Sequence, residues 1–296
     1  MVVDETKAGL QRVLDALTAP ESHHVAAPPD ATASVEAVTL WYQPKIDIKQ
    51  RCLAGAEAFP RIDGAAPGAD LSDDDMAGLT EQALLAALRD WTVFDAAGFN
   101  LRLSINVPVV LLDRLPIAAI VGENRPKAEH WPGLLVEVAE DQIARDIKRI
   151  QQIAANLRGS GIKVAIDDFG AGYSSFASLR EISFAELKLN ASFVQGCAGD
   201  PTNGAICQTA IDLAHRFGSA AVAEGIETVA DFQAMQIMGC DFAQGRLIAP
   251  PMAKDDFMAL LQQRLNKSRA PKVETTGAAA AAQSSDEQTP PAAASA

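Results

Sequence analysis

Short apolar runs alternate with amphipathic segments along the middle of the chain. Apolar and β-branched residues predict strands at 38–46, 52–59, 101–106, 134–138, 162–167, 185–189, 220–224 and near 241–248. Between and after them, residues 72–97, 144–161, 205–218, 228–239 and 252–265 have the three-and-four spacing of helices. Strands that alternate with helices predict a parallel sheet. Seven or eight such units in about 230 residues favour one closed α/β barrel over an open sheet.

The two ends of the chain have a different pattern. Residues 4–18 have helical spacing, and residues 19–36 are a linker rich in Pro, Ala and polar residues. That helix could be a stalk, a dimer contact or a link to another module, or it could simply be loosely packed. Residues 267–296 contain almost no large apolar side chains, so we expect them to be disordered. The expected organisation is therefore 1–37 helix and linker, 38–266 barrel, and 267–296 tail.

Polar side chains stand at the ends of the predicted strands. They are Glu57, Asn106, Glu137, Asp167, Lys188 and Glu224. The carboxyl ends of parallel barrel strands converge on one face, so these residues would meet in one site. The small residues Gly55 and Ala165, two positions before an acid, would leave room for a ligand. Oxygen donors without His or Cys suit Mg²⁺ or Mn²⁺ better than Zn²⁺.

Each of these acids alone could be a helix N-cap or a solvated loop residue. Their recurrence on successive strand ends weakens that interpretation. Lys188 lies between Leu187 and Leu189 in a buried strand and therefore needs a carboxylate or ligand partner. The four histidines lie outside the pattern and are interpreted as structural or solvated: His23, His24, His130 and His215.

Charge and composition limit the partners. The formal charge of -13 argues against a nucleic-acid polymer or an anionic membrane surface, but not against a small anionic ligand beside metal ions. The start of the chain lacks the order of a signal peptide, and the most apolar window, 101–121, contains charges, so we expect no membrane insertion. The four cysteines show no CxxC spacing and are expected to be reduced and mostly buried. Because disulfides are rare in the cytoplasm, we expect a cytoplasmic protein.

Several sequence motifs, in this order, resemble those of one family. They are WYQPKID, GAEAFPRI, LSINV, VEVAED, IDDFGAGYSSFASL, ELKLNASFV, AEGIET and GCDFAQGRLIAPPM. The motifs cover about residues 38–263, and they resemble the EAL-domain cyclic di-GMP phosphodiesterases. The resemblance implies a TIM-like (βα)8 barrel whose first strand is antiparallel to the others. It also implies hydrolysis of cyclic di-GMP to linear pGpG with two Mg²⁺ or Mn²⁺ ions, which lowers the level of a second messenger.

The resemblance also implies residue roles. The implied metal ligands are Glu57, Asn106, Glu137, Asp167, Asp168 and Glu224, of which Glu224 is also counted with Lys188 as catalytic. Lys188 would contact the attacking water, and the implied substrate contacts are Gln43, Arg61 and Gln244. Glu140 would anchor the loop after Asp168, and Glu227 would lie just behind the ligands.

The chain departs from the family pattern beside the site. The signature Glu-Ala-Leu is Glu57-Ala58-Phe59, the usual Asp of LKID is Asn190, and the usual Tyr after Gln-Gly is Arg246. These changes leave two alternatives to an enzyme: a cyclic di-GMP receptor that cleaves little or nothing, and a protein-interaction module. A two-carboxylate barrel glycosidase is a more distant alternative. By analogy with the family, a homodimer or a regulatory protein partner is also expected.

Overall fold

The computed structural model describes residues 38–67, 71–143, 147–170, 179–180 and 182–269, with side chains described as far as residue 263. The expected N-terminal helix and linker lie outside the described residues. So do positions 171–178 of the loop after Asp168 and most of the expected C-terminal tail. The barrel expected over 38–266 is therefore the part of the chain that the structure shows.

The strands form a closed barrel. They are β1 (Thr39–Asp47), β2 (Cys52–Arg61), β3 (Arg102–Asn106), β4 (Leu134–Ala139), β5 (Ile162–Phe169), β6 (Glu186–Leu189), β7 (Ala220–Ala223), β8 (Phe242–Ala243) and β9 (Met252–Ala253). Neighbouring strands from β2 to β8 are parallel, and β1 closes the ring by pairing antiparallel with both β2 and β8. The predicted TIM-like barrel with an antiparallel first strand is thus confirmed.

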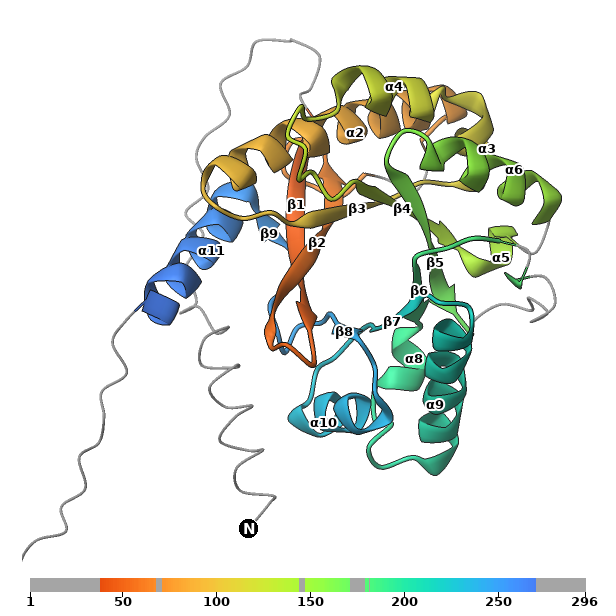
Figure 1. The fold of residues 1–296 in the computed structure, drawn as a ribbon, viewed down its shortest axis with the longest axis vertical. Helices are drawn as coiled ribbons and strands as arrows, with labels where there is room; N and C mark the ends of the chain where they lie inside the picture. Colours follow the sequence, from red (N-terminus) through yellow and green to blue (C-terminus); the bar gives the residue numbers. More distant parts are fainter. Residues whose placement is uncertain (1–37, 68–70, 144–146, 171–178, 181, 270–296) are drawn as a thin grey trace, which may run out of the picture.

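Helices surround the barrel (Figure 1). They are α2 (Asp73–Ala96), α3 (Val109–Arg114), α4 (Ile117–Asn124), α5 (Glu140–Ile143), α6 (Ile147–Arg158), α8 (Ala191–Val194), α9 (Pro201–Arg216), α10 (Val229–Met238) and α11 (Lys254–Arg269). The first long one, α2, begins where the sequence provides a cap: the Ser72 side chain accepts a hydrogen bond from the Asp75 backbone N–H. The acidic residues in the first turn of α2 also stabilise the helix, because their negative charges lie at the positive end of the helix dipole.

An aromatic cluster attaches two helices to the outside of β1. The fully buried Tyr42 ring packs against Phe94 of α2 and Phe257 of α11, with centroid distances of 5.1 and 5.4 Å. Its hydroxyl donates to Asp90 Oδ2 over 2.7 Å, which satisfies the buried polar atom. Lys254 Nζ lies 3.2 Å from the other Asp90 oxygen. The first and last helices of the described barrel therefore meet on the same strand.

The last part of the barrel differs from the sequence prediction. The strand expected near 241–248 is only Phe242–Ala243, and Met252–Ala253, predicted as the start of a helix, pairs with β1 instead. After β8 the backbone turns against Ile226, which donates to Gln244 O and accepts from Leu247 N. A Cβ at Gly245 would lie 2.3 Å from the Ile226 backbone. This close approach ends the strand.

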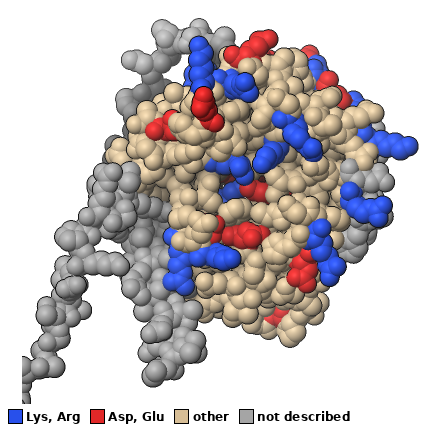
Figure 2. Space-filling view, viewed as in Figure 1, with Lys and Arg blue, Asp and Glu red and all other residues tan. Residues whose placement is uncertain are grey.

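Three further properties concern the described residues. None of their helices is both long and apolar enough to cross a membrane. The cysteines are free, and three of the four are buried, as expected. Charges of both signs are spread over the face seen in Figure 2, so no extended basic surface for a nucleic-acid polymer is visible there.

Candidate active site

The carboxyl ends of the strands hold a cluster of charged side chains inside the barrel. Strand register places Gln43 opposite Glu57 and Asn106 beside Glu137. Because side chains alternate along a strand, Glu137 points inward while its neighbours Val136 and Val138 pack outward. Residues from the two halves of the chain therefore converge, as the strand-end pattern predicted.

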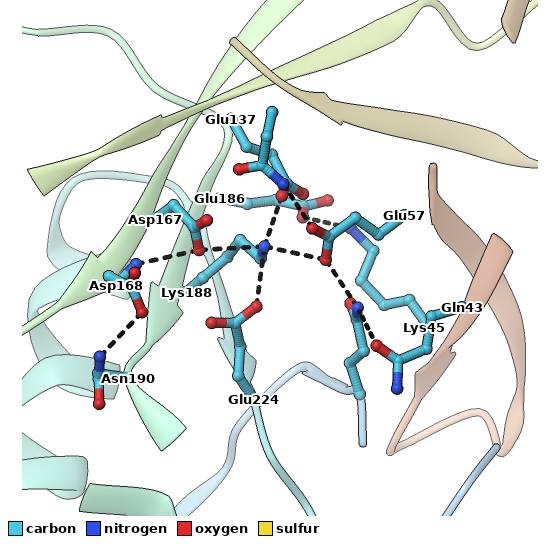
Figure 3. Close-up of polar contacts among 12 residues, drawn as sticks. Gln43, Lys45, Glu57, Glu137, Asp167, Asp168, Glu186, Lys188, Asn190 and Glu224 are labelled. Carbon is cyan, nitrogen blue, oxygen red and sulfur yellow. Dashed lines mark hydrogen bonds and ion pairs between the residues drawn. The ribbon is translucent and has the colours of Figure 1, made fainter. Parts of the chain in front are cut away.

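Lys188 lies at the centre of this cluster (Figure 3). It is only 1% exposed, and its Nζ contacts one carboxylate oxygen from each of four strand ends. The distances are 2.5 Å to Glu137, 2.8 Å to Glu224, 3.0 Å to Asp167 and 3.2 Å to Glu57. Lys188, which was expected to need a partner because it lies in an apolar strand, is thus paired with four carboxylates.

Two acids of this cluster, Asp167 and Glu224, also lie close to a third, Asp168. One carboxylate oxygen from each of Asp167, Asp168 and Glu224 lies within 4.8 Å of the others. Asp168 has a positive φ of 56°, a conformation that Asp tolerates better than most residues, and its N–H donates to Asp167 Oδ1. Asn190 Nδ2 donates to Asp168 Oδ1 over 2.8 Å. The carboxyl end of β5 therefore carries both aspartates beside Glu224.

Amide side chains hold Glu57 in place. Asn106 Nδ2 donates to Glu57 Oε1 over 2.6 Å, and Gln244 Nε2 donates to Oε2 over 2.7 Å. Gln244 also donates to Gln43 Oε1, and Gln43 Nε2 donates to Ala249 O. The chain of contacts runs from β3 across β2 to the segment after β8. It fixes the rotamer of Glu57 within the cluster.

Arg61 lies at the end of β2, four residues beyond Glu57. Its guanidinium rests over the Trp41 ring at 5.0 Å and near the Phe59 ring at 5.9 Å. It also donates to Pro60 O over 2.9 Å. The bulky Phe59 of the signature thus packs beside an arginine.

The two remaining predicted residues lie further from the centre. Glu140 is buried, and its Oε2 accepts a hydrogen bond from the Gly170 N–H over 2.8 Å, which ties α5 to the turn after β5. Glu227 is exposed and lies 4.0 Å from Arg246, which is also exposed. The structure therefore places Glu140 against the expected loop, and it places Glu227 at the surface.

Burial and mutual repulsion change the ionisation of the cluster. Burial is the main cause of the shift for Glu224, and it raises the pKa of this carboxyl to about 8. Burial and the Glu57 charge raise the pKa of Glu137 well above its usual value. For Glu57, Lys188 and Gln244 outweigh burial and lower the pKa. Although burial alone would lower the pKa of Lys188, the surrounding acids raise it well above its usual value.

The donor set fits hard divalent cations. All the clustered ligand atoms are oxygens, which suits Mg²⁺ or Mn²⁺. Glu137 Oε1 is buried and has no hydrogen-bond partner among the described residues, so it has a free coordination position. The raised pKa values of Glu137 and Glu224 mean that excess negative charge is held by protons, which a bound cation would displace.

Sequence reasoning missed one buried pair. Lys45 and Glu186 form an ion pair inside the barrel, and each side chain is 3% exposed. The signal was present, because Lys45 follows Gln43 by two and Glu186 precedes Lys188 by two, so alternation puts all four on the inner face. A separate hollow of about 710 Å³, near Arg125, Trp131 and Lys163, is lined by none of the clustered acids.

An α/β barrel with an antiparallel first strand and a lysine-centred acidic mouth defines the class of protein. The model of the EAL domain matches residues 30–251, and the chain belongs to this family. The matched range includes all of the strand-end residues of the cluster.

Three bacterial proteins similar to this chain are a sequence relative and two solved structures. A cyclic di-GMP phosphodiesterase of Pseudomonas aeruginosa is 34% identical over 238 residues, which are 77% of this chain and 40% of that protein. The phosphodiesterase MucR in its c-di-GMP complex is 27% identical, with a TM-score of 0.65 over 75% of this chain and 94% of that one. The EAL domain of Mycobacterium smegmatis DcpA is 29% identical, with a TM-score of 0.64 over 77% of this chain and 96% of that one.

The chain spans well under half the length of the first curated relatives that it matches. The shares of those proteins are 40%, 28% and 34%. The family model matches residues 30–251, which hold most of the barrel.

Proposed function

We propose that this chain hydrolyses cyclic di-GMP to linear pGpG with the help of Mg²⁺ or Mn²⁺, two ions per site. The observation that carries the proposal is the buried Lys188 with its four carboxylate contacts at the mouth of an EAL-family barrel. The phosphodiesterase relative from Pseudomonas aeruginosa and the c-di-GMP complex of MucR support the choice of substrate.

The residues that would hold the cations share oxygen ligands directed into the mouth. They are Glu57, Asn106, Glu137, Asp167, Asp168 and Glu224. Bound divalent cations neutralise a phosphodiester, make a nearby water more acidic and stabilise the leaving oxygen. The Gln244 and Asn106 amides hold the Glu57 carboxylate in one orientation, so this ligand is positioned before any cation arrives.

Lys188 would position the attacking water. In the hydrolysis, the water oxygen forms a bond to phosphorus and the bond between phosphorus and a ribose 3′-oxygen breaks. The water loses a proton and the departing 3′-oxygen gains one. Lys188 Nζ has three N–H donors and no acceptor, so it directs a lone pair of the water away from phosphorus and stabilises the negative charge that develops. Glu224, which lies 2.8 Å from Lys188 Nζ, is placed to accept or return a proton beside that lysine.

Substrate contacts are assigned to residues on the rim. Arg61, held over Trp41, would face a phosphate or guanine of the dinucleotide. Gln43 and Gln244 would contact the ligand from the opposite side of Glu57. Glu140 would fix the turn at Gly170. Glu227, which is exposed near Arg246, would act on the ligands only indirectly.

We assign the reaction to the barrel unit expected over 38–266, with residues 1–37 or a homodimer contact as the place of regulation. The free cysteines fit a reducing compartment, so we place the activity in the cytoplasm.

A receptor that binds cyclic di-GMP without cleaving it is the second candidate. The observation that favours it is the hydrogen bond from Asn190 to Asp168, because it places a neutral amide where a further carboxylate would strengthen cation binding. A pure interaction module is supported by no contact of the described site.

The proposal is tested by incubating the purified chain with cyclic di-GMP and Mn²⁺ and following pGpG by chromatography. Metal-dependent formation of pGpG is expected. Binding of cyclic di-GMP without product would replace the enzyme by the receptor, and the absence of both would leave an interaction module.

A further inference from the structure

A second lysine is buried in the barrel, and the proposed reaction does not use it. Lys45 Nζ contacts Glu186 Oε2, and both side chains are 3% exposed. Figure 3 shows this pair beside the contact between Lys188 and Glu57. Two buried cations therefore share one lumen with at least five carboxylates.

The pair lies one side-chain layer below the acidic centre. On β1, Lys45 is opposite Gly55 while Gln43 is opposite Glu57, so Lys45 is one inward position deeper. A Cβ at Gly55 would lie 3.6 Å from Lys45 Cε, and the Phe242 ring lies 5.7 Å from Lys45 Nζ. The barrel wall thus surrounds the lysine stem and directs its ammonium toward Glu186.

Glu186 is also close to the other lysine. Glu186 and Lys188 share the inner face of β6, and inward side chains two residues apart stand about 6.6 Å apart along a strand. An unpaired carboxylate in a buried setting strongly attracts the nearest cation. Without Lys45, Lys188 is the buried cation on the same inner face of β6, two residues from Glu186.

We propose that Lys45 is a positioning residue: by neutralising Glu186 it keeps Lys188 directed at Glu57, Glu137, Asp167 and Glu224. The proposal rests on the proposed function, since it assigns Lys188 and these acids to the reaction. It extends that function by adding a role for the side-chain layer below the acidic centre: there Lys45 neutralises the charge of Glu186.

The inference predicts opposite effects of two neutral substitutions on Mn²⁺ affinity, measured by titration calorimetry without substrate. Lys45→Met leaves Glu186 unpaired and draws Lys188 down, so the upper acids are freed and Mn²⁺ should bind at least tenfold more tightly. Glu186→Gln releases Lys45 toward the same acids, so Mn²⁺ should bind at least tenfold more weakly. The double variant removes both charges and should return to within threefold of the unmodified chain. Lys49→Met, at an exposed turn, is the matched control and should change nothing.

The same variants separate positioning from simple structural support. With cyclic di-GMP, Lys45→Met should lower kcat at least tenfold with little change in KM, and adding Glu186→Gln should recover most of the rate. The inference would be overturned if both single variants changed the Mn²⁺ affinity in the same direction, or if the double variant showed no recovery. A wild-type chain that binds no Mn²⁺ would also overturn it. If Lys45→Met does not fold, weaker Mn²⁺ binding by Glu186→Gln and its recovery in the double variant decide the matter. A wild-type chain that binds Mn²⁺ but forms no pGpG contradicts the enzyme proposal alone, and the affinity pattern still decides the inference.

Discussion

Asn190 donates its side-chain amide to Asp168, with Nδ2 2.8 Å from Oδ1. The same side chain caps α8, because Asn190 Oδ1 accepts from the Ser192 N–H. Burial and Asp167 raise the pKa of Asp168, and the Asn190 amide opposes that rise. One residue thus stabilises both a helix start and a proposed metal ligand.

We expect Asn190→Asp to strengthen cation binding and to raise the rate of pGpG formation. The change places a carboxylate beside Asp168, so a bound divalent cation gains a further negative neighbour. In the metal-free protein, the hydrogen bond to Asp168 is replaced by repulsion between two carboxylates. The metal-free variant should be less stable by about 1–2 kcal/mol. Mn²⁺ titration and thermal unfolding in a chelator measure the two effects.

Asn190→Ser is the control for this substitution. Serine retains the ability to cap α8 but brings no charge and cannot reach Asp168 in the same way. Its Mn²⁺ affinity should not rise. If Asn190→Asp and Asn190→Ser bind Mn²⁺ equally, the charge at this position does not matter for cation binding.

Lys188→Met should make the fold depend on divalent cations. Removing the ammonium leaves four clustered carboxyls without their shared partner, which should destabilise the metal-free protein by about 3 kcal/mol. Added Mn²⁺ should therefore raise the melting temperature of this variant more than that of the unmodified chain. Lys148→Met, on the exposed side of α6, should leave the shift unchanged. An equal Mn²⁺ shift in Lys188→Met and the unmodified chain would contradict the assignment of the cluster as the cation site.

Gly55→Ala should distort the site from within the sheet. An added Cβ would lie 2.3 Å from Arg102 O on the neighbouring strand, so β2 and β3 would have to separate beneath Glu57. We expect a loss of about 2–3 kcal/mol in the free energy of unfolding. Gly78→Ala is the matched change, because a Cβ there meets no atom within 4 Å and lies in α2; it should stabilise by about 0.5–1 kcal/mol. Urea unfolding compares the two, and a tolerated Gly55→Ala would argue against the tight register.

Asp231 should make stability depend on pH outside the active site. Burial disfavours its charge, but the Thr228 hydroxyl and nearby backbone N–H groups, including that of Ala198, outweigh burial and lower its pKa. A lowered folded pKa stabilises the fold above the unfolded value of about 3.9, and this contribution is lost as pH falls through the folded pKa. Asp231→Asn should therefore destabilise by about 1–2 kcal/mol near neutral pH. The difference from the unmodified chain should shrink toward about pH 3 in urea unfolding. A constant difference across that range would show that the charge is unimportant.

Much of the fold could be predicted because the strands are apolar and the helices amphipathic. The β5 and β4 segments read as near-continuous apolar runs, as buried parallel strands do. The end of the barrel could not be predicted, because the two-residue β8 stops where Gly245 packs against the Ile226 backbone. A contact between residues so far apart in sequence leaves no local pattern.

The acids of the site could be predicted from their places at strand ends, but their pairing could not. Lys188 was recognisable as a buried cation in need of a partner, yet its four contacts depend on barrel closure. The Lys45–Glu186 pair joins β1 to β6 across the lumen. The sequence of neither strand indicates which residue of the other strand is the partner. Alternation gives the face of a side chain, whereas the partner depends on the shear of the whole barrel.

The most direct test of the account compares pGpG formation by the unmodified chain and by Glu57→Ala, side by side with Mn²⁺ and cyclic di-GMP. The account predicts turnover by the unmodified chain that is abolished in a chelator and at least 10²-fold slower in Glu57→Ala, because Glu57 loses its place as a cation ligand. Turnover retained by Glu57→Ala, or no pGpG from the unmodified chain with Mn²⁺ bound, would contradict it.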